Sequence, residues 1–282
     1  MTPEDFTFVA RLLKDQTGLV LTRDKAYLVE NRLQSVVREH RLADLTELLA
    51  EVRGGNPAAT TDLIDAMMSK DTGFFRDWKP FKHLAEVVLP NLRRARLAKR
   101  TFRILCAGCA SGQEAYSVAM QIVEEAQHFT GWQVEIVGID LSAAAIDAAG
   151  RGAYNQFEVQ RGLPIRRLLR HFTKVGSGWT INENLRRMVS FRVWNLLEDM
   201  FPLGRFDVVL CRNVLIAFDQ QTKIATLQKL ARLLTDDGVL YVGVNESVTG
   251  VSGAFRVIAS TLGIYAAQHE GVPPSHSMAA HL

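Results

Sequence analysis

The segment Arg103–Ser117 does most to constrain what this chain can fold into. It continues an apolar run, Phe102–Ala107, which has the length of a buried strand, and the run breaks at Gly108 into small residues. From Gln113 onward, apolar residues recur at helical spacing. The pattern predicts a strand, a glycine-rich turn and a helix, which would let a ligand approach bare backbone at a helix N-terminus. An ordinary strand-to-helix turn has the same pattern, so this segment alone leaves ligand binding open.

From Thr101 onward, predicted strands and helices alternate along the chain, which is typical of a parallel, doubly wound α/β sheet. The remaining strands are expected at 134–139, 189–194, 206–211, 239–244, 255–258 and 264–267, the last two as a closing pair. Helices are expected at about 113–126, 143–149 and 222–234. Residues 151–187 form a long insertion with a short strand at 179–181 and a helix at 165–172, and an insertion of this size is more often functional than filler.

The chain before this sheet is predicted to be helical. Residues 1–85 form an all-helical domain that begins with the start signal Thr2-Pro3-Glu4-Asp5, and residues 86–100 form a linker helix. A connecting helix is expected at 81–92, stopped near Pro90, with residues 93–100 as its polar, basic continuation. The sheet domain then covers 101–270, and the tail 271–282 is expected to be disordered.

Composition narrows the classes of function. No apolar run approaches the roughly 20 residues that a membrane span needs, and the N-terminus lacks a secretion signal, so we expect a cytoplasmic protein without membrane insertion. Cys106 and Cys109 form a C-x-x-C pair, but no second pair or histidine pair accompanies it, and we expect no metal. The net charge is only +3, yet basic residues cluster. Such clusters suit nucleic acid, an acidic protein surface or simple solvation. They are Arg11, Lys14, Arg23, Lys25, Arg32, Arg38 and Arg41; Arg93, Arg94, Arg96, Lys99, Arg100 and Arg103; and Arg166, Arg167 and Arg170.

Polar side chains follow four of the predicted strands. They are Glu114 beyond the glycine turn, Asp140, Asn195, and Arg212 with Asn213. The carboxyl ends of parallel strands share one edge of a sheet, and ligands of α/β sheets bind there. Asp140 could accept hydrogen bonds from the ribose hydroxyls of a nucleoside or could cap the next helix, and its position at the strand end favours the ribose.

Together these residues resemble the class I S-adenosylmethionine-dependent methyltransferases and, more narrowly, the chemotaxis receptor glutamate methyltransferases of the CheR family. The resemblance covers nearly the whole chain and rests on the N-terminal helices and on five segments: Thr72-Gly-Phe-Phe-Arg-Asp77, Ala107-Gly-Cys-Ala-Ser-Gly-Gln-Glu-Ala-Tyr-Ser117, Gly162-Leu-Pro164, Asn195-Leu196 and Phe206-Asp-Val-Val-Leu-Cys-Arg-Asn-Val-Leu-Ile216. It implies a Rossmann-like seven-stranded methyltransferase sheet with a small β-subdomain inserted at 151–187, preceded by an all-α domain.

The resemblance also implies roles for particular residues. Thr72 and Arg76 would contact the cofactor, with Arg76 also at the reacting end of the site. Glu114 would meet the methionine amino group of S-adenosylmethionine, and Asp140 would meet its ribose. The remaining cofactor-binding residues would be Asn195 and Leu196 at the adenine, and Arg212 and Asn213 along the lining.

The implied reaction is methylation of glutamate side chains on chemoreceptors, which yields glutamate methyl esters and S-adenosylhomocysteine. A glutamate carboxyl has a pKa near 4.3 in solution, so it is already a nucleophile at neutral pH and needs no general base. The basic N-terminal helices would dock on the receptor's cytoplasmic helical bundle. The inserted subdomain could bind a peptide at the receptor's C-terminus.

Three places depart from the family pattern. They are Lys70, Ala217 and the segment Gly243-Val-Asn-Glu246, and the first two support an alternative. Lys70 stands where the family usually has asparagine, and Ala217 stands where it usually has a tyrosine beside the reacting methyl. A catalytically impaired paralogue that binds S-adenosylmethionine or its product, and acts as a regulator or scaffold, is therefore the second hypothesis. Nucleic-acid methylation is a weak third, because target-binding motifs such as Asn-Pro-Pro-Tyr are absent.

Overall fold

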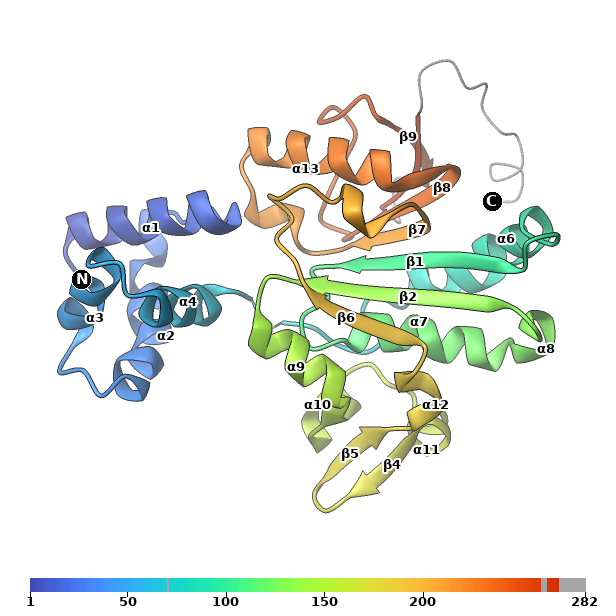
Figure 1. Cartoon of the computed structure of the whole chain (residues 1–282), viewed down its shortest axis with the longest axis horizontal. Helices are drawn as coiled ribbons and strands as arrows, with labels where there is room; N and C mark the ends of the chain where they lie inside the picture. The colour runs from blue at the N-terminus through green and yellow to red at the C-terminus, as the bar shows by residue number, and fades with distance from the viewer. Residues whose placement is uncertain (70, 260–262, 269–282) are drawn as a thin grey trace. The chain divides into compact units, whose positions relative to one another are not determined.

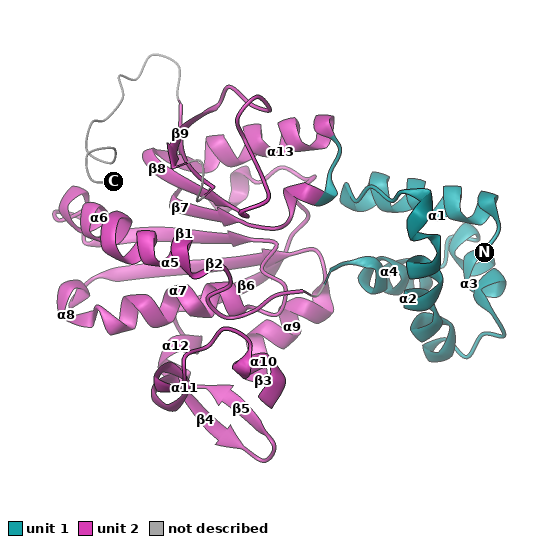
Figure 2. Ribbon diagram, turned by 180° about the vertical axis from the view of Figure 1, so that it is seen from behind, with its two compact units in different colours: residues 1–69, 217–219 teal, residues 70–216, 220–282 magenta. Residues whose placement is uncertain are grey.

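The structure is a computed structural model, and it describes residues 1–69, 71–259 and 263–268. Lys70 and the predicted tail 271–282 lie outside the described residues. The chain divides into two units, one of residues 1–69 with 217–219 and one of residues 70–216 with 220–282 (Figure 2). No helix in the described part combines the length and the apolar character that crossing a bilayer requires.

The first unit is all-helical (Figure 1). Thr2 and Asp5 form a reciprocal capping box at the start of its first helix, and Gly18 ends that helix with a left-handed φ of 78°. Asn56 caps the last helix just before a proline at its first position. Apolar faces of the four α-helices meet in one buried core. The helices are α1 (Pro3–Thr17), η1 (Arg23–Lys25), α2 (Ala26–Glu39), α3 (Leu45–Arg53) and α4 (Pro57–Met67).

A short segment from much later in the chain, Ala217–Asp219, belongs to this helical unit. The amide of Val20 donates to the carbonyl of Ala217 at 2.9 Å, and the amine of Lys14 pairs with the carboxylate of Asp219 at 2.7 Å. Ala217, the position where the sequence departs from the family pattern, is therefore held by the N-terminal helices.

The second unit is built on a seven-stranded sheet in the order β6-β2-β1-β7-β8-β10-β9. β10 runs antiparallel to both of its neighbours, and the other neighbouring pairs are parallel. This topology confirms the predicted doubly wound, Rossmann-like methyltransferase sheet with a closing strand pair. The strands are β1 (Thr101–Ala107), β2 (Gln133–Asp140), β6 (Val189–Val193), β7 (Phe206–Cys211), β8 (Leu234–Val242), β9 (Phe255–Ala259) and β10 (Ile264–Ala267).

The helices of this unit lie on both sides of the sheet (Figure 1). The prediction that the helix before β1 stops near Pro90 is wrong, since helical structure continues to Ala95. Pro90 follows a wide π-helical turn and lies in the first turn of α6, where a missing N–H costs little. The helices are α5 (Trp78–His83), η2 (Leu84–Val88), α6 (Leu89–Ala95), α7 (Gln113–Glu124), α8 (Ala126–Phe129), α9 (Ala143–Arg151), η3 (Phe201–Leu203), η4 (Leu215–Ala217) and α13 (Gln220–Leu233).

The insertion folds as a small subdomain with an antiparallel sheet in the order β3-β5-β4. Its ties to the rest of the unit are aromatic and polar: the Tyr154 hydroxyl donates to the carbonyl of Ser111 at 2.7 Å, and the Phe74 ring packs edge-on against Tyr154 and Phe172. The predicted β-subdomain is confirmed, with two strands that the sequence did not predict, β3 and β4. Its elements are β3 (Ala153–Tyr154), α10 (Gln156–Gln160), α11 (Ile165–His171), β4 (Phe172–Val175), β5 (Gly178–Ile181) and α12 (Glu183–Arg186).

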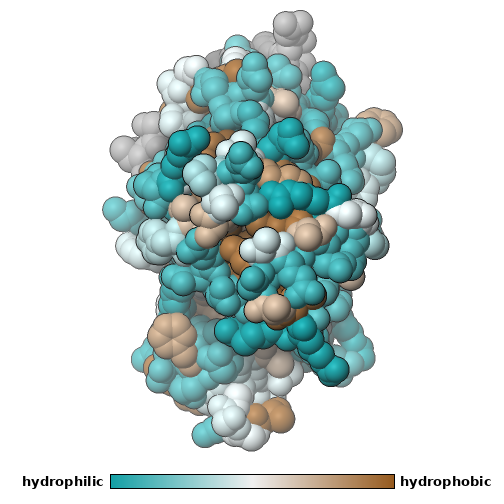
Figure 3. Space-filling view, turned by 90° about the vertical axis from the view of Figure 1, so that its left-hand side faces the viewer, coloured by the Kyte–Doolittle hydropathy of each residue, from teal (hydrophilic) through white to brown (hydrophobic). Residues whose placement is uncertain are grey.

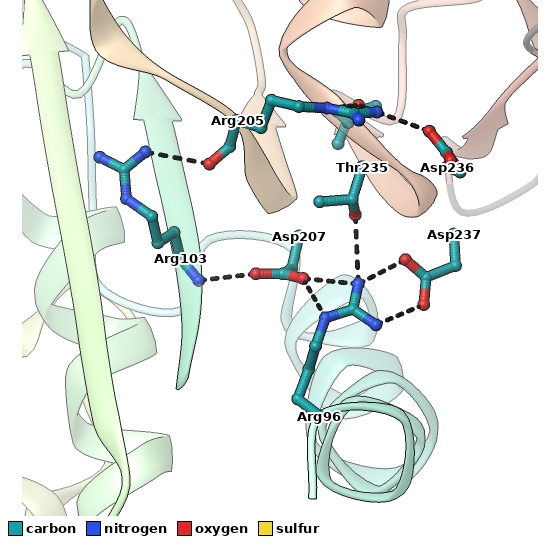
Figure 4. A network of polar contacts seen from close by, with 8 residues as sticks. Arg96, Arg103, Arg205, Asp207, Thr235, Asp236 and Asp237 are labelled. Carbon is teal, nitrogen blue, oxygen red and sulfur yellow. Dashed lines mark hydrogen bonds and ion pairs between the residues drawn. The ribbon is translucent and has the colours of Figure 1, made fainter. Parts of the chain in front are cut away.

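Part of the predicted basic surface is used inside the second unit (Figure 4). The buried carboxylate of Asp207 accepts hydrogen bonds from Arg96 Nε at 2.9 Å and from the Arg103 amide at 2.8 Å. Arg96 also pairs with Asp237, and Arg103 pairs with Glu135 at 2.6 Å. Arg96 and Arg103 therefore stabilise the strand starts and do not belong to a docking face.

Candidate active site

Six of the eight predicted site residues end or follow four strands that are consecutive in the sheet, β6, β2, β1 and β7, whereas Thr72 and Arg76 lie before β1. Ala107 at the end of β1 lies opposite Ile139, and Asp140 at the end of β2 lies opposite Val193. The amide of Trp194 donates to the carbonyl of Asp140 at 2.9 Å. The residues after these strands therefore follow one another along a single edge, as predicted from the parallel pattern.

The glycines of the turn after β1 are required by local packing. Gly108 has φ of 73°, and a Cβ there would lie 2.4 Å from Val214 Cγ2. Gly112 has φ of 90°, and a Cβ there would lie 3.0 Å from both Ala149 and Phe191. The amide of Gly108 donates to the Ile139 carbonyl at 2.8 Å, which ties the turn to β2. The turn's own geometry thus accounts for these glycines, and close approach of a ligand stays a prediction.

Asp140 braces this turn. One carboxylate oxygen accepts from the Ala110 amide at 2.9 Å, and the other accepts from the Ser142 amide at 3.0 Å. The cap of helix α9 is Ser142, whose hydroxyl accepts from the Ala145 amide at 3.1 Å. Ser142, and not Asp140, therefore caps helix α9. The ribose role of Asp140 stays a prediction.

Glu114 and Arg212 meet in a buried ion pair. Arg212 Nη1 donates to Glu114 at 2.9 Å, while Nη2 donates to the Arg76 carbonyl at 2.9 Å and to the Asp77 carboxylate at 3.0 Å. The Arg212 side chain is only 2% exposed, and its Nε has no hydrogen-bond partner within the described part of the chain. Burial raises the pKa of Glu114 above its ordinary value, although Arg212 favours the ionised form. The pair thus holds a carboxylate and an incompletely satisfied guanidinium at the β1–β7 part of the edge.

Arg76 lies in the same segment but faces a different acid. Its Nη1 donates to the Asp71 carbonyl at 2.8 Å, and its Nη2 pairs with the Asp71 carboxylate at 3.1 Å. Arg161 from the inserted subdomain pairs with the same carboxylate at 2.6 Å, and its hydrogen bond lowers the pKa of Asp71. Thr72 is half-buried beside this cluster in the chain. One carboxylate therefore neutralises part of the charge of both arginines.

The backbone on each side of Arg76 is strained. Phe75 has φ of 49° and Asp77 has φ of 53°, a left-handed region that bulky residues avoid. The Phe75 amide donates to the buried Ser117 hydroxyl at 3.0 Å, and its ring packs on Phe81. These contacts impose the conformation that presents Arg76.

The residues after β6 form a compact turn. The Asn195 side-chain oxygen accepts from the Leu197 amide at 3.0 Å, and the Leu196 side chain is buried. Lys229 from α13 donates to the Leu196 carbonyl at 3.4 Å. The structure thus places Asn195 and Leu196 at the β6 end of the edge, next to Asp140.

Sequence reasoning missed Glu246 as a site residue. Its buried carboxylate lies after β8 and accepts backbone N–H groups from Asn213, Gly243 and Ile216. Asn213 itself has φ of 62°. The signals for Glu246 were its place just beyond a strand end and the departure of Gly243-Val-Asn-Glu246 from the family pattern.

The C-x-x-C pair is buried. Burial raises the pKa of the Cys106 and Cys109 thiols well above the usual range, so both are protonated at neutral pH. Among the described residues, no group of three or more His, Cys, Asp or Glu side chains is arranged to hold a metal ion.

Comparisons with known proteins match both units. The family model described as "CheR methyltransferase, SAM binding domain" matches residues 70–264, and "CheR methyltransferase, all-alpha domain" matches residues 4–68. A chemotaxis protein methyltransferase of Vibrio anguillarum is 37% identical over 268 residues, which cover 94% of this chain and 96% of the relative. Chemotaxis protein methyltransferase 1 of Pseudomonas aeruginosa is 35% identical over 264 residues, with 92% and 96% covered.

A solved structure, PKMT2 from Rickettsia typhi in complex with AdoHcy, aligns over 51% of this chain and 21% of that chain, with 17% identity and a TM-score of 0.33. That likeness is too slight to carry an argument. The two family models and the curated relatives instead cover nearly the full length of the chain. The chain therefore belongs to the CheR methyltransferase family.

Proposed function

We propose that this protein transfers the methyl group of S-adenosylmethionine to glutamate side chains of chemoreceptors. The observation that carries the proposal is the match of both family domains, together with relatives named chemotaxis protein methyltransferase over more than nine-tenths of the chain. The non-catalytic alternative is not favoured, because the curated relatives that match nearly the whole chain are named as methyltransferases.

The order of residues along the sheet edge fits the shape of the cofactor. Asn195 and Leu196 follow β6, Asp140 ends β2, Glu114 follows β1 and Arg212 follows β7. S-adenosylmethionine is an adenine, a ribose and a charged amino-acid tail in the same linear order. Adenine at Asn195 and ribose at Asp140 would place the ammonium group at Glu114. The buried Nε of Arg212, which has no hydrogen-bond partner among the described residues, then offers a donor for the tail's carboxylate.

The chemistry asks little of the protein beyond positioning. The bound sulfonium supplies a methyl group that is already activated, and a glutamate is ionised at neutral pH. A glutamate oxygen forms a bond to the methyl carbon as the carbon–sulfur bond breaks, and its electron pair stays on sulfur. No proton moves. Arg76 would orient the substrate carboxylate. Because Arg76 also pairs with Asp71, it would bind that carboxylate less tightly, and the carboxylate would stay reactive as a nucleophile.

We propose that the N-terminal helices bind the cytoplasmic helical bundle of the receptor. Five basic residues of this unit are exposed and make no ion pair within the described residues, whereas Arg32 donates to the Met67 carbonyl and Lys14 pairs with Asp219. Figure 3 shows one face of the molecule, which is mostly hydrophilic with small hydrophobic groups. The five exposed basic side chains are the groups of this unit that an acidic partner would contact. The five are Arg11, Arg23, Lys25, Arg38 and Arg41.

The inserted subdomain offers a second contact. Its strand β4 is an edge strand whose Thr173, Lys174 and Val175 are exposed, so an extended peptide could pair with it. We propose that a C-terminal receptor peptide binds at this edge.

The test is transfer of labelled methyl from S-adenosylmethionine to membranes that contain a chemoreceptor. We expect label in the receptor that base releases, as for a methyl ester. Glu114→Gln should lose at least tenfold in affinity for S-adenosylhomocysteine by calorimetry. Glu183→Gln, at an exposed i,i+4 pair with Arg187, is the matched control and should behave as the natural protein. Cofactor binding without any base-labile label would refute the proposed reaction.

A further inference from the structure

Glu246 is an unusual buried carboxylate because its partners are backbone amides. Oε2 accepts from the Asn213 amide at 2.7 Å and from the Gly243 amide at 2.6 Å, and Oε1 accepts from the Ile216 amide at 2.9 Å. The residue is 8% exposed. Within the described residues it makes no ion pair, so these three hydrogen bonds are the contacts that hold its carboxylate group in place.

The three amides belong to two segments that Glu246 ties together. Gly243 directly follows β8, while Asn213 and Ile216 lie in the loop after β7. The segments approach so closely that a Cβ on Gly243 would lie 2.8 Å from Asn213 Nδ2 and 3.0 Å from the Asn213 amide. Glycine at 243 therefore permits the contact, and the carboxylate of Glu246 closes it.

The loop that Glu246 holds also carries Arg212. Asn213 adopts a left-handed φ of 62°, a region that asparagine enters more readily than most residues other than glycine. The hydrogen bond from its amide to Glu246 stabilises that conformation. The Asn213 amide belongs to the peptide unit that joins Arg212 to Asn213, so its hydrogen bond to Glu246 also restrains the backbone of Arg212, from which the guanidinium side chain extends. That side chain reaches Glu114, Asp77 and the Arg76 carbonyl.

We propose that Glu246 is a positioning residue for the amino-acid tail of the cofactor, acting through the backbone of residues 212–216. The proposal rests on the proposed function, since it takes Glu114 and Arg212 as the groups that meet this tail. Glu246 does not touch the cofactor. It fixes the loop so that the guanidinium of Arg212 and the carboxylate of Glu114 stay together at one end of the site.

A positioning role makes a prediction that general loss of stability does not. Two probes separate the ends of the site: S-adenosylhomocysteine carries the amino-acid tail, and 5′-methylthioadenosine has only the adenine, ribose and sulfur. Glu246→Gln keeps the shape of the side chain. In the natural protein both carboxylate oxygens accept N–H groups, and the variant replaces one of them with an amide nitrogen, which cannot accept. We expect affinity for S-adenosylhomocysteine to fall about tenfold and affinity for methylthioadenosine to stay within twofold, by calorimetry.

The matched control is Glu183→Gln, which should leave both affinities unchanged. Equal weakening of both probes in Glu246→Gln would mean a merely structural role and would overturn the proposal, as would unchanged affinity for S-adenosylhomocysteine. If the natural protein binds neither probe, the proposed function fails. If it binds both and the variant does not discriminate, only the role of Glu246 fails.

A second measurement needs no variant. Hydrogen exchange of the natural protein should show the amides of residues 212–216 gaining protection with S-adenosylhomocysteine but not with saturating methylthioadenosine. Equal protection by the two probes, or none by either, would overturn the assignment even if Glu246→Gln did not fold.

Discussion

Replacing Arg212 by methionine should strongly destabilise the sheet unit. The guanidinium is 2% exposed and makes three hydrogen bonds of 2.9–3.0 Å, two of them to carboxylates. Removing one partner of a buried ion pair leaves an uncompensated charge and costs about 3–5 kcal/mol. Glu114 and Asp77 would both lose that partner. For a unit of this size we expect the melting temperature to fall by about 6–20 °C, at roughly 2–4 °C per kcal/mol.

A double-mutant cycle separates the ion pair from the rest of this loss. Glu114→Gln leaves Arg212 with Asp77 and the Arg76 carbonyl, so it should cost about 1–3 kcal/mol. Combined with Arg212→Met, it removes the buried unpaired carboxylate. The double variant should therefore be less destabilised than the sum of the single variants, by about 1–3 kcal/mol.

The assay is hydrogen exchange of the β7 amides, which reports opening of the sheet unit separately from the helical unit. Tm measurements by calorimetry accompany it. Effects that add within about 0.5 kcal/mol would mean that Glu114 and Arg212 are not coupled, and the buried pair would then be refuted as a source of stability.

Three further predictions test the surroundings of the site. Gly162→Ala should lower the free energy of unfolding by about 2 kcal/mol or more, because φ is 88° and the new Cβ would lie 2.2 Å from the Phe74 carbonyl oxygen. The control for backbone strain alone is Gly55→Ala, where φ is 82° and a Cβ would meet no atom within 4 Å. Burial lowers the pKa of His83, so the unfolded state binds the proton at a higher pH than the folded state does. The free energy of unfolding should therefore fall as the pH drops below about 6.5, by at most about 1.4 kcal/mol per pH unit. In His83→Gln, the free energy of unfolding should depend less on pH. Asp207→Asn should lower stability by about 3–5 kcal/mol in urea titrations, since two donors depend on that buried carboxylate.

The core strands could be predicted because each is an apolar run that ends in polar residues. Phe206–Cys211 was predicted with the bounds that the structure shows, and all six of its residues are buried. Such a strand, covered on both faces, has an unbroken apolar signal. Helix starts were equally clear where a side chain caps the backbone, as at Thr2 and Ser142.

Strands that form by pairing alone could not be predicted. In β4, Phe172 is buried and the next three residues are exposed, so no alternation marks the segment. It is a strand because Thr173 and Lys174 lie opposite residues of β5 across a tight turn. The predicted helix end at Pro90 was wrong for a related reason. The π-helical turn before Pro90 accommodates the proline, and no local sequence pattern marks such a turn.

The site shows the same division between local and distant causes. The rule for parallel strands brought Glu114 and Arg212 to one edge, and the structure joins them across 98 positions of sequence. The role of Glu246 could not be predicted, because its partners are backbone amides, which every residue carries. The function of the basic clusters could not be predicted either. Arg96 and Arg103 pair with acidic side chains at the strand starts, and only the fold distinguishes them from basic neighbours that stay exposed.

Backbone strain distinguishes this site from an ordinary sheet edge. Four of the described non-glycine residues with positive φ lie at the site segments, and they are Phe75, Asp77, Ala110 and Asn213. Each costs about 1–3 kcal/mol and persists only where surrounding contacts impose it. Those contacts are specific here: Ser117 holds the Phe75 amide, Asp140 holds that of Ala110, and Glu246 holds that of Asn213. Side-chain acceptors thus fix the backbone at three places along the edge, so the site is shaped before any ligand binds, and a reaction that needs only approach geometry benefits most from such a site.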